Sequence, residues 1–458
     1  MLFHTWTFAV FFLIVYAVYV PTRGSRFSVY WLFAASHLFY AWWNPVYLLL
    51  LFATTFIDWL IVIYMKKSRR PKLWLIFSLV SNFGFLAFFK YTNFMVANLD
   101  AVFGWLGVSW YIPDPHIMLP IGISFHTFQS MSYTIDAYYG VVETERSFIR
   151  FGAFVSFFPQ LVAGPIERAK NLLGQMYGRR EITRQHLTDG LSLILVGLFK
   201  KVAIADYLAT YVDQVYAAPT LFNAPALALA TFAFAWQIYC DFSGYTDMAR
   251  GIARLMGFNL MLNFNNPYLA TGLGEFWQRW HISLSTWFKD YVYIPLGGNR
   301  GGPVRTYVNM FLTMILSGIW HGASWTFVIW GFLHAVGRLL TRELERTRLY
   351  GQGVPKLVKQ LLVFAFVSLT WIFFRATSLH DAIIILTRLA TTPLTDPQFP
   401  ALGYALCFGL WGYEYAFESR YRHFLELGTV RVLTAAGMIV YLLLFASSRS
   451  QTFIYFQF

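Results

Sequence analysis

A histidine at the junction of two apolar runs is the residue of this sequence best placed to do chemistry. His321 follows Trp320 and is flanked by Gly318 and Gly322. An ionisable side chain at membrane depth is costly and marks a functional site by default. Histidine suits a general base because burial favours its neutral, proton-accepting form. The two glycines would let a substrate or another backbone approach closely. The alternative is a histidine hydrogen-bonded within a helix interface.

Three further histidines have weaker local signals. His281 lies in the amphipathic stretch 275–285, where an interfacial histidine among anchoring tryptophans is the stronger interpretation. His126 stands in an apolar run with polar neighbours, so it lines a polar path or is satisfied by its own helix. His334 follows His321 by 13 residues, which is about 220° around a continuous helix, so we interpret it as structural.

Several standard chemistries lack their motifs. No two histidines are three or four residues apart, and the sequence has no GxSxG, GxxxxGK[ST] or HExxH motif. These absences count against a hydrolase, an ATP-driven pump and a zinc protease, and they leave a transporter open. Cys240 and Cys407 both lie in apolar context, so neither a disulfide framework nor a bound metal is expected.

The composition requires lipid as the solvent for most of the chain. Hydrophobic residues make up 57% and charged residues 12%, far from the balance of soluble domains, and the mean hydropathy is +0.51. The net charge of +13 comes from basic residues in short loops between apolar runs, notably 66–72. Such loops are held on the cytoplasmic side of a bilayer, so the charge indicates membrane topology and not nucleic-acid binding.

Apolar windows along the chain predict an all-α, polytopic membrane protein. A crossing needs about 20 apolar residues, and the windows predict roughly ten to twelve transmembrane or re-entrant helices. The loops place Arg23, Arg26 and the 66–72 cluster in the cytoplasm, and the N-terminus and the Asn44–Pro45 turn outside. The windows are 6–20, 29–43, 46–64, 73–89, 117–133, 151–162, 191–208, 224–239, 307–320, 324–340, 357–374, 402–413 and 432–445.

The interval 241–303 does not fit a simple crossing. It combines many charged residues with tryptophans, and its one long charge-free run is interrupted by asparagines and Pro267. We expect interfacial or re-entrant helices that line a polar cavity near the active site, with an ordinary interfacial helix and loop as the alternative. No repeat or linker is visible, so residues 1–458 are predicted to form a single membrane domain.

Motifs along nearly the whole chain resemble those of the membrane-bound O-acyltransferase (MBOAT) family, in its bacterial alginate O-acetyltransferase-like branch. The matching stretches are 157–168, 241–249, 263–267, 276–285, 293–300, 320–323, 370–375 and 453–458.

The resemblance implies an enzyme that moves an acyl group from a cytoplasmic thioester toward hydroxyls of an extracytoplasmic polysaccharide, with acetyl favoured and other acyl groups left open. Alginate, cellulose, another exopolysaccharide and peptidoglycan are all open as acceptors. His321 matches the family's catalytic histidine, and His281 matches the second position of its signature pair. The implied fold is a ring of tilted helices around a central funnel.

The remaining expectations concern ligands, partners and location. Acetyl-CoA is the expected donor, and basic groups would bind its phosphates. The expected partners are the lipid bilayer, a periplasmic SGNH-hydrolase-like acetyltransferase and a polysaccharide synthesis and export complex, in the bacterial inner membrane. The competing interpretation is a transporter or flippase for a lipid-linked glycan. The candidate substrate-binding residues are Trp320, Arg279, Ser285, Asn299, Gln160 and His126, and the candidate acetyl-CoA-binding residues are Arg168, Lys289 and Arg300.

Overall fold

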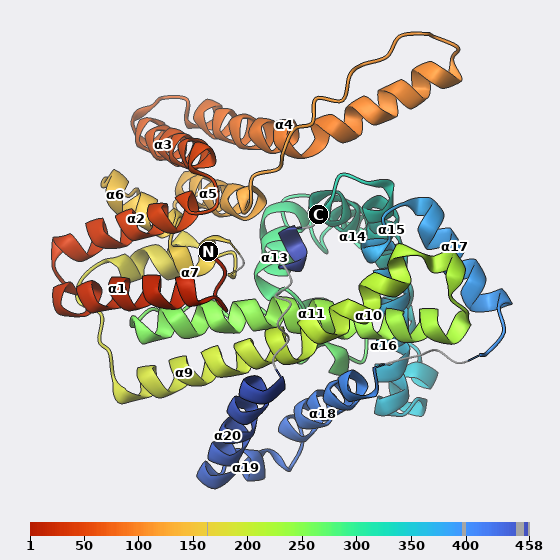
Figure 1. The fold of residues 1–458 in the computed structure, drawn as a ribbon. Coiled ribbons are helices and arrows are strands. Elements are labelled where there is room, and N and C mark those ends of the chain that lie inside the picture. Colours follow the sequence, from red (N-terminus) through yellow and green to blue (C-terminus); the bar gives the residue numbers. More distant parts are fainter. Residues whose placement is uncertain (163, 396–399, 446–452, 457–458) are drawn as a thin grey trace. The chain divides into compact units, whose positions relative to one another are not determined.

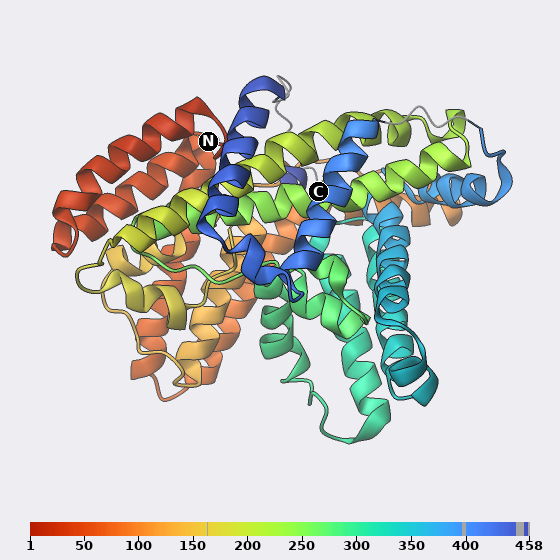
Figure 2. The same cartoon turned by 90° about the horizontal axis from the view of Figure 1, so that it is seen from below.

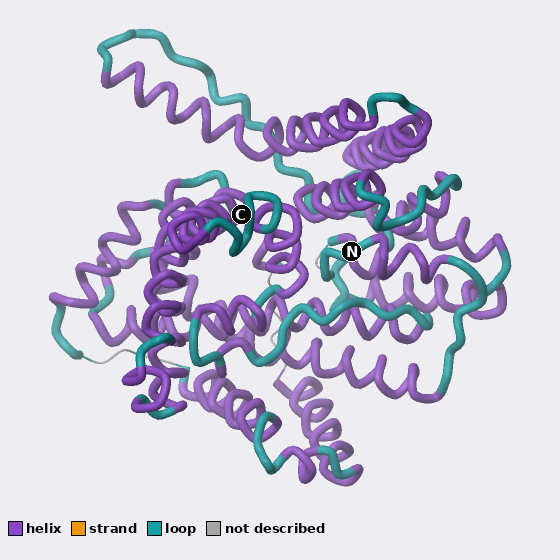
Figure 3. The backbone as a smooth tube through the Cα atoms, turned by 180° about the vertical axis from the view of Figure 1, so that it is seen from behind, coloured by secondary structure: helices purple, strands orange, loops and turns teal. Residues whose placement is uncertain are grey.

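Helices form the regular structure of the described residues. This computed structural model describes residues 1–162, 164–395, 400–445 and 453–456 (Figure 3). Within those ranges 17 helices have 7 or more residues, which confirms the predicted all-α class. Ala163, Gln457 and Phe458 belong to the motifs named above and lie outside the described residues.

The chain divides into two compact units, and each is described by itself. The first comprises Met1–Leu191 and Ala249–Met261, and the second comprises Ser192–Met248 and Leu262–Phe458. Helices α9 (Arg184–Leu198) and α11 (Ala224–Leu255) contribute residues to both. The prediction of a single domain over residues 1–458 stays a prediction.

The first unit starts with helix pairs joined by short turns. α1 and α2 lie side by side (Figure 2), as do α3 and α4 (Figure 1). Local sequence sets the start of α3, because the Val46 backbone N–H donates to the Asn44 side chain at 2.9 Å and Pro45 opens the helix. The helices are α1 (Trp6–Thr22), α2 (Arg26–Ala41), α3 (Pro45–Lys67), α4 (Pro71–Trp105), α5 (Ile123–Tyr138), α6 (Phe148–Val155), α7 (Phe158–Leu161) and α8 (Ala169–Leu172).

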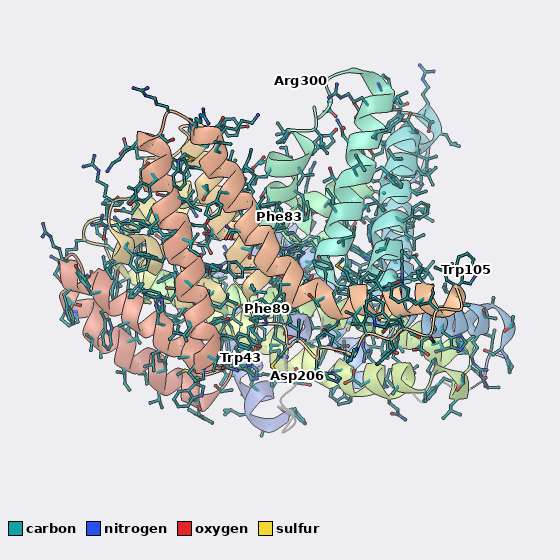
Figure 4. The ribbon with its side chains drawn as sticks, turned by 90° about the horizontal axis from the view of Figure 1, so that it is seen from above. Trp43, Phe83, Phe89, Trp105, Asp206 and Arg300 are labelled. Atoms are coloured by element: carbon teal, nitrogen blue, oxygen red, sulfur yellow. The ribbon has the colours of Figure 1, made fainter. Side chains whose placement is uncertain are left out.

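The long helix α4 is bent. It has 35 residues, roughly 52 Å of helix, against a bilayer core of about 30 Å. Figure 4 shows the helix changing direction near Phe89 before it reaches Trp105. Only part of α4 is therefore needed to cross the bilayer.

The second unit holds the remaining helices. α14, α15 and α16 supply residues around His321, which lies at the turn between α14 and α15. The short helices α12 and α13 precede α14 in the sequence. The elements are the π-helical segment η2 (Phe199–Ala205), α10 (Asp206–Ala217), α12 (Leu273–Arg279), α13 (Ile282–Phe288), α14 (Gly302–His321), α15 (Trp325–Glu345), α16 (Lys356–Arg375), α17 (Leu379–Thr391), α18 (Ala401–Phe417), α19 (Arg422–Leu425), α20 (Gly428–Phe445) and the 3-10 turn η7 (Ile454–Phe456).

Four helices of the described chain are long and apolar enough to cross a membrane: α3, α4, α16 and α20. They agree with four of the predicted windows. Other windows differ from the helices that form. The window 151–162 is divided between α6 and α7, with Pro159 in the first turn of α7. The window 191–208 contains the π-helical segment η2. Asp241, where the interval of broken helices was expected to begin, lies inside α11, which continues to Leu255.

Candidate active site

His321 is the last residue of α14, and glycines set its position. At Gly318 an added Cβ would lie 2.5 Å from the backbone oxygen of Phe327 and 3.0 Å from Cα of Gly331, so α14 and α15 touch through their backbones. Gly322 then leaves the helix in an extended conformation, and Ser324 caps α15 by accepting from the Thr326 N–H. The C-terminal end of a helix stabilises a nearby cation. His321 therefore sits where the imidazolium formed by a general base is stabilised.

Aromatic rings from four elements surround His321, which is 5% exposed. The ring centroids lie 4.9 Å away for Trp320 of α14, 5.0 Å for Trp330 of α15, 5.3 Å for Phe374 of α16 and 6.0 Å for Tyr455 of η7. Such walls exclude water and leave little room for side reactions. The alternative of a histidine satisfied in an ordinary helix interface is weakened by this enclosure.

His281 precedes α13 in a conformation that few non-glycine residues adopt. Its φ is 43° and the residue is fully buried, at 0% exposed. Strain of this kind persists where surrounding structure enforces it and is concentrated at functional sites. Burial lowers the pKa of His281 to about 3, so its ring is neutral at physiological pH.

Hydrogen bonds define which ring nitrogen of His281 carries its proton. The backbone N–H of Ser283 donates to Asn263 Oδ1 at 3.2 Å, which fixes the orientation of the Asn263 amide because an N–H needs an acceptor. The same oxygen lies 3.1 Å from His281 Nδ1. His281 Nδ1 therefore donates, and Nε2 is the acceptor of the neutral ring.

The two candidate catalytic histidines share neighbours. The His281 ring lies 6.5 Å from that of Trp320 and 6.4 Å from that of Tyr455, and both of these also contact His321. The structure thus brings together His281, Trp320 and His321. Tyr455 was not among the predicted site residues, although its stretch 453–458 had been noted for its resemblance to the family.

The second unit contains a cavity of about 360 Å³. Its wall includes Ser317, one helical turn before His321, and Leu284 and Ser285, which follow His281 in α13. Lys289, Arg338 and Arg342 supply positive charge to the lining.

The cavity gathers three of the predicted ligand-binding residues and two that were missed. Ser285, Asn299 and Lys289 line it, and their binding roles stay predictions. Arg338 and Arg342 also line it, and their spacing of four residues on α15 places them on one face of that helix. This basic pair at helical spacing is the signal that sequence reasoning could have used.

Two other predicted residues of the second unit have different surroundings. Arg279 pairs with Glu275 at 2.8 Å and with Glu418, so its guanidinium is held between two carboxylates. Arg300 is exposed at the tip of the turn before α14 (Figure 4). Neither lines the cavity described above, and their roles in binding stay predictions.

Three predicted residues, His126, Gln160 and Arg168, belong to the first unit. His126 Nε2 lies 3.1 Å from Thr55 Oγ1, which itself donates to the Leu51 carbonyl, so His126 donates through Nε2. Gln160 donates to the Phe154 carbonyl at 2.7 Å. These bonds support a packing role, and binding roles for all three stay predictions.

His334 has structural contacts, although the geometric reason differs from the one expected. Its Nε2 lies 3.0 Å from Thr370 Oγ1, which donates to the Val367 carbonyl, so the histidine donates to Thr370. The chain is broken between α14 and α15, so an angle around one continuous helix does not apply. The ring of Trp330 contacts the rings of both His334 and His321.

Comparison with known proteins shows the family of this chain. Residues 139–379 match the membrane-bound O-acyltransferase (MBOAT) family. The chain is 41% identical over 386 residues, 83% of this chain and 73% of the relative, to a probable alginate O-acetylase AlgI of Pseudomonas aeruginosa. It is 35% identical over 394 residues, 80% of this chain and 74% of the relative, to a peptidoglycan O-acetyltransferase of Helicobacter pylori.

A less similar relative is named for the transfer of a different group. The chain is 29% identical over 238 residues, 49% of this chain and 60% of the relative, to a teichoic acid D-alanyltransferase of Bacillus subtilis. The chain belongs to the membrane-bound O-acyltransferase family: it is a multi-pass membrane enzyme that transfers acyl groups to oxygen, and its relatives are bacterial.

Proposed function

We propose that this protein transfers an acetyl group from cytoplasmic acetyl-CoA toward hydroxyls of an extracytoplasmic polysaccharide, with His321 as general base. The observation that carries the proposal is the basic cavity whose wall reaches Ser317, one turn before His321. Acetyl-CoA needs cations to bind its phosphates and a narrow apolar path for the part of the molecule that carries the thioester. Lys289, Arg338 and Arg342 supply the cations.

The charge of the second unit supports a cytoplasmic entrance for the donor. Basic residues are concentrated before α14, at the end of α15 and at the start of α16. Loops of this kind are held in the cytoplasm. The cavity's cations belong to the same end of the α14–α15 hairpin, whereas His321 lies at its other end. The basic residues before α14, at the end of α15 and at the start of α16 are Arg300, Arg305, Arg342, Arg346, Arg348, Lys356 and Lys359.

The chemical step uses the neutral form of His321. As the acceptor hydroxyl attacks the thioester carbonyl, His321 takes its proton. The C–S bond then breaks, the acetyl group remains on the acceptor oxygen, and the CoA thiolate leaves and is protonated to the thiol. His281 Nε2, as a hydrogen-bond acceptor, orients the hydroxyl beside His321. Transfer either reaches the final acceptor directly or passes through an acylated intermediate.

The acceptor of the acetyl group, the partner proteins and the membrane are the remaining parts of the proposed function. The relatives named above act on alginate, peptidoglycan and teichoic acid, and we favour an extracytoplasmic polysaccharide. A periplasmic SGNH-hydrolase-like partner and a polysaccharide export complex would pass the acetyl group onward in the inner membrane. The fold would be a single domain of roughly ten to twelve transmembrane or re-entrant helices around a funnel.

Thioester consumption separates this function from transport of a lipid-linked glycan. Inside-out membrane vesicles that contain the protein and its co-expressed periplasmic partners are supplied with acetyl-CoA, and free CoA thiol is measured. Acyl transfer requires thiol release that depends on this protein. A transporter gives none, and that result would overturn the proposal.

A second arm of the experiment tests the donor cavity. Arg342→Gln removes one charged hydrogen-bond donor, so the KM for acetyl-CoA should rise roughly tenfold or more, with a smaller change in kcat. Arg346→Gln is the matched control, because Arg346 is exposed and pairs with Glu343 at 2.9 Å. An unchanged KM in Arg342→Gln would show that the donor binds elsewhere.

A further inference from the structure

Residues 453–456 reach the histidine pair, and one side chain of α11 holds their backbone. Asp241 Oδ2 accepts a hydrogen bond from the Ile454 backbone N–H at 2.7 Å. Phe453 and Ile454 are both buried. A buried hydrogen bond from a backbone N–H to a carboxylate is stronger than one between neutral groups. Asp241 therefore fixes the position of this stretch, which we call the η7 segment.

Two aromatic residues of α11 fix the direction of the η7 segment. The ring of Phe242 lies 4.5 Å from that of Tyr455, and the ring of Tyr245 lies 4.5 Å from that of Phe453. One face of α11 therefore binds the segment through a carboxylate and two rings. The result is that Tyr455 contacts both His321 and His281.

Asp241 is itself held by a buried lysine. Lys201 Nζ lies 2.8 Å from Asp241 Oδ1 and 2.7 Å from Asp206 Oδ1. The three residues are 1–3% exposed. Two carboxylates this deeply buried need a cation between them, because an unpaired buried charge costs several kcal/mol. Lys201 therefore holds Asp241 in place through one carboxylate oxygen and leaves the other to accept from Ile454.

The local backbone explains why Lys201 can reach Asp241. Gly197 of α9 and Gly244 of α11 approach so closely that a Cβ on Gly197 would lie 2.5 Å from the Gly244 backbone oxygen. Directly after this contact the chain widens into the π-helical η2, which contains Lys201. Single π-helical turns are frequent at functional sites. The glycine contact and the π-helical turn together aim Lys201 at α11.

We propose that Asp241 and Lys201 are positioning residues for the acyl-transfer site, which act through Ile454 to hold Tyr455 against His321 and His281. α14, α15 and α16 supply three of the rings around His321, and Tyr455 of η7 supplies the fourth. Releasing the η7 segment removes that part of the wall and admits water beside His321. The chemical step should therefore slow, while binding of the donor's phosphates by Lys289, Arg338 and Arg342 should change little. This inference rests on the function proposed above.

The chain offers a matched control next to the cluster. Lys200 of η2 pairs with Asp247 of α11 at 2.9 Å, so this ion pair joins the same two elements. Neither residue is hydrogen-bonded to Ile454 in the contacts described above. Replacing Asp247 therefore reproduces the loss of an ion pair between η2 and α11 without releasing the η7 segment.

The first test measures the segment without measuring activity. Ile454→Cys introduces a thiol at a buried position, and its reaction with a maleimide is followed in the full-length protein in membranes. Cys240 and Cys407 are buried, and the protein without Ile454→Cys supplies their background. We expect at least tenfold faster labelling when Asp241→Ala is added and no change when Asp247→Ala is added. Equal labelling in both would overturn the proposal.

The second test measures whether Asp241 acts through Tyr455. Tyr455→Ala and Asp241→Ala should each lower kcat at least tenfold, with less than a twofold change in the KM for acetyl-CoA. The double variant should be no slower than the slower single variant, because both remove the same wall. Additive losses would overturn the proposal. If Asp241→Ala does not accumulate, Asp241→Asn keeps an oxygen acceptor for Ile454, and it should lower kcat less than Tyr455→Ala does.

The two tests distinguish this inference from the proposed function. Absence of acyl transfer in the unmodified protein would overturn the function, and the labelling result would still decide whether Asp241 holds the η7 segment. Normal acyl transfer together with slow labelling in Asp241→Ala would overturn the inference alone.

Discussion

Two histidines with different surroundings divide the chemistry at the residue scale. His321 ends α14, where the helix stabilises the cation that a general base becomes. His281 is fully buried, its pKa is lowered to about 3, and Asn263 fixes its proton on Nδ1. The first histidine is therefore suited to take a proton and the second to accept a hydrogen bond through Nε2.

Asn263→Asp should change the protonation of His281. A carboxylate at this position still accepts from Nδ1–H, and it stabilises the charged ring, so the His281 pKa should rise from about 3. Protonation removes the Nε2 acceptor, and activity would be lost below the new pKa. The acid limb of the pH profile of kcat/KM should therefore move to higher pH.

The exposed residue Asn265 supplies the control for this substitution. Asn265→Asp adds the same charge nearby, and its acid limb should stay where it is in the unmodified protein. An acid limb that does not move in Asn263→Asp would contradict the assigned tautomer.

The sequence singled out three residues of the candidate site, and the others that the structure brings there share a physical reason for being missed. His321 and Trp320 could be found from a recognisable local run, and His281 only through the family resemblance. Asn263 and Tyr455 could not, because their roles come from contacts with residues 18 or more than 100 positions away. Local pattern carries no information on such pairings.

At the scale of elements, the hairpin of α14 and α15 positions the site. Gly318 and Gly331 let the two helices touch, and the break after His321 turns the chain back. The sequence predicted a close approach at Gly318 and Gly322. The structure identifies the partner as the backbone of α15 at Gly318 and the ring of Phe327 at Gly322. The separate windows 307–320 and 324–340 predicted the break between α14 and α15, whereas the angle between His321 and His334 assumed one continuous helix.

Gly318→Ala should separate the hairpin. The added Cβ would lie 2.5 Å from the Phe327 backbone oxygen, so the helices must move apart. Overpacking of this kind costs about 1–3 kcal/mol, and the displacement should lower acyl transfer by at least tenfold. Thermal unfolding in detergent and thiol release check the two effects.

A glycine with free space around it provides the comparison for that variant. Gly437 of α20 has no atom within 4 Å of an added Cβ, so Gly437→Ala should leave activity intact and raise stability by about 0.5–1 kcal/mol. Equal behaviour of the two variants would show that the close approach of α14 and α15 does not matter for the site.

At the scale of the whole molecule, loop charge sets orientation. Lys66 and Lys67 end α3, and Arg69, Arg70 and Lys72 follow them. The helices α3 and α4 flank this turn, and both can cross a bilayer. The sequence predicted this part well, because hydropathy and charge are local properties. It predicted the interval 241–303 less well, because α11 carries its charges on a continuous helix.

Labelling from the two sides of the membrane should confirm that orientation. Ser68→Cys, in the turn after α3, should react with an impermeant maleimide only in inside-out vesicles. Ser109→Cys, in the exposed stretch after α4, should react only in right-side-out vesicles. Labelling of both thiols from the same side would contradict a crossing by α4.

The most direct test of the central claim compares acyl transfer in two histidine variants. His321→Ala removes the proposed base and should lower CoA thiol release by roughly 100-fold or more, with normal membrane level and thermal unfolding. His334→Gln is the control, since it keeps a donor for Thr370, and it should retain activity. Full thiol release by His321→Ala would contradict the account.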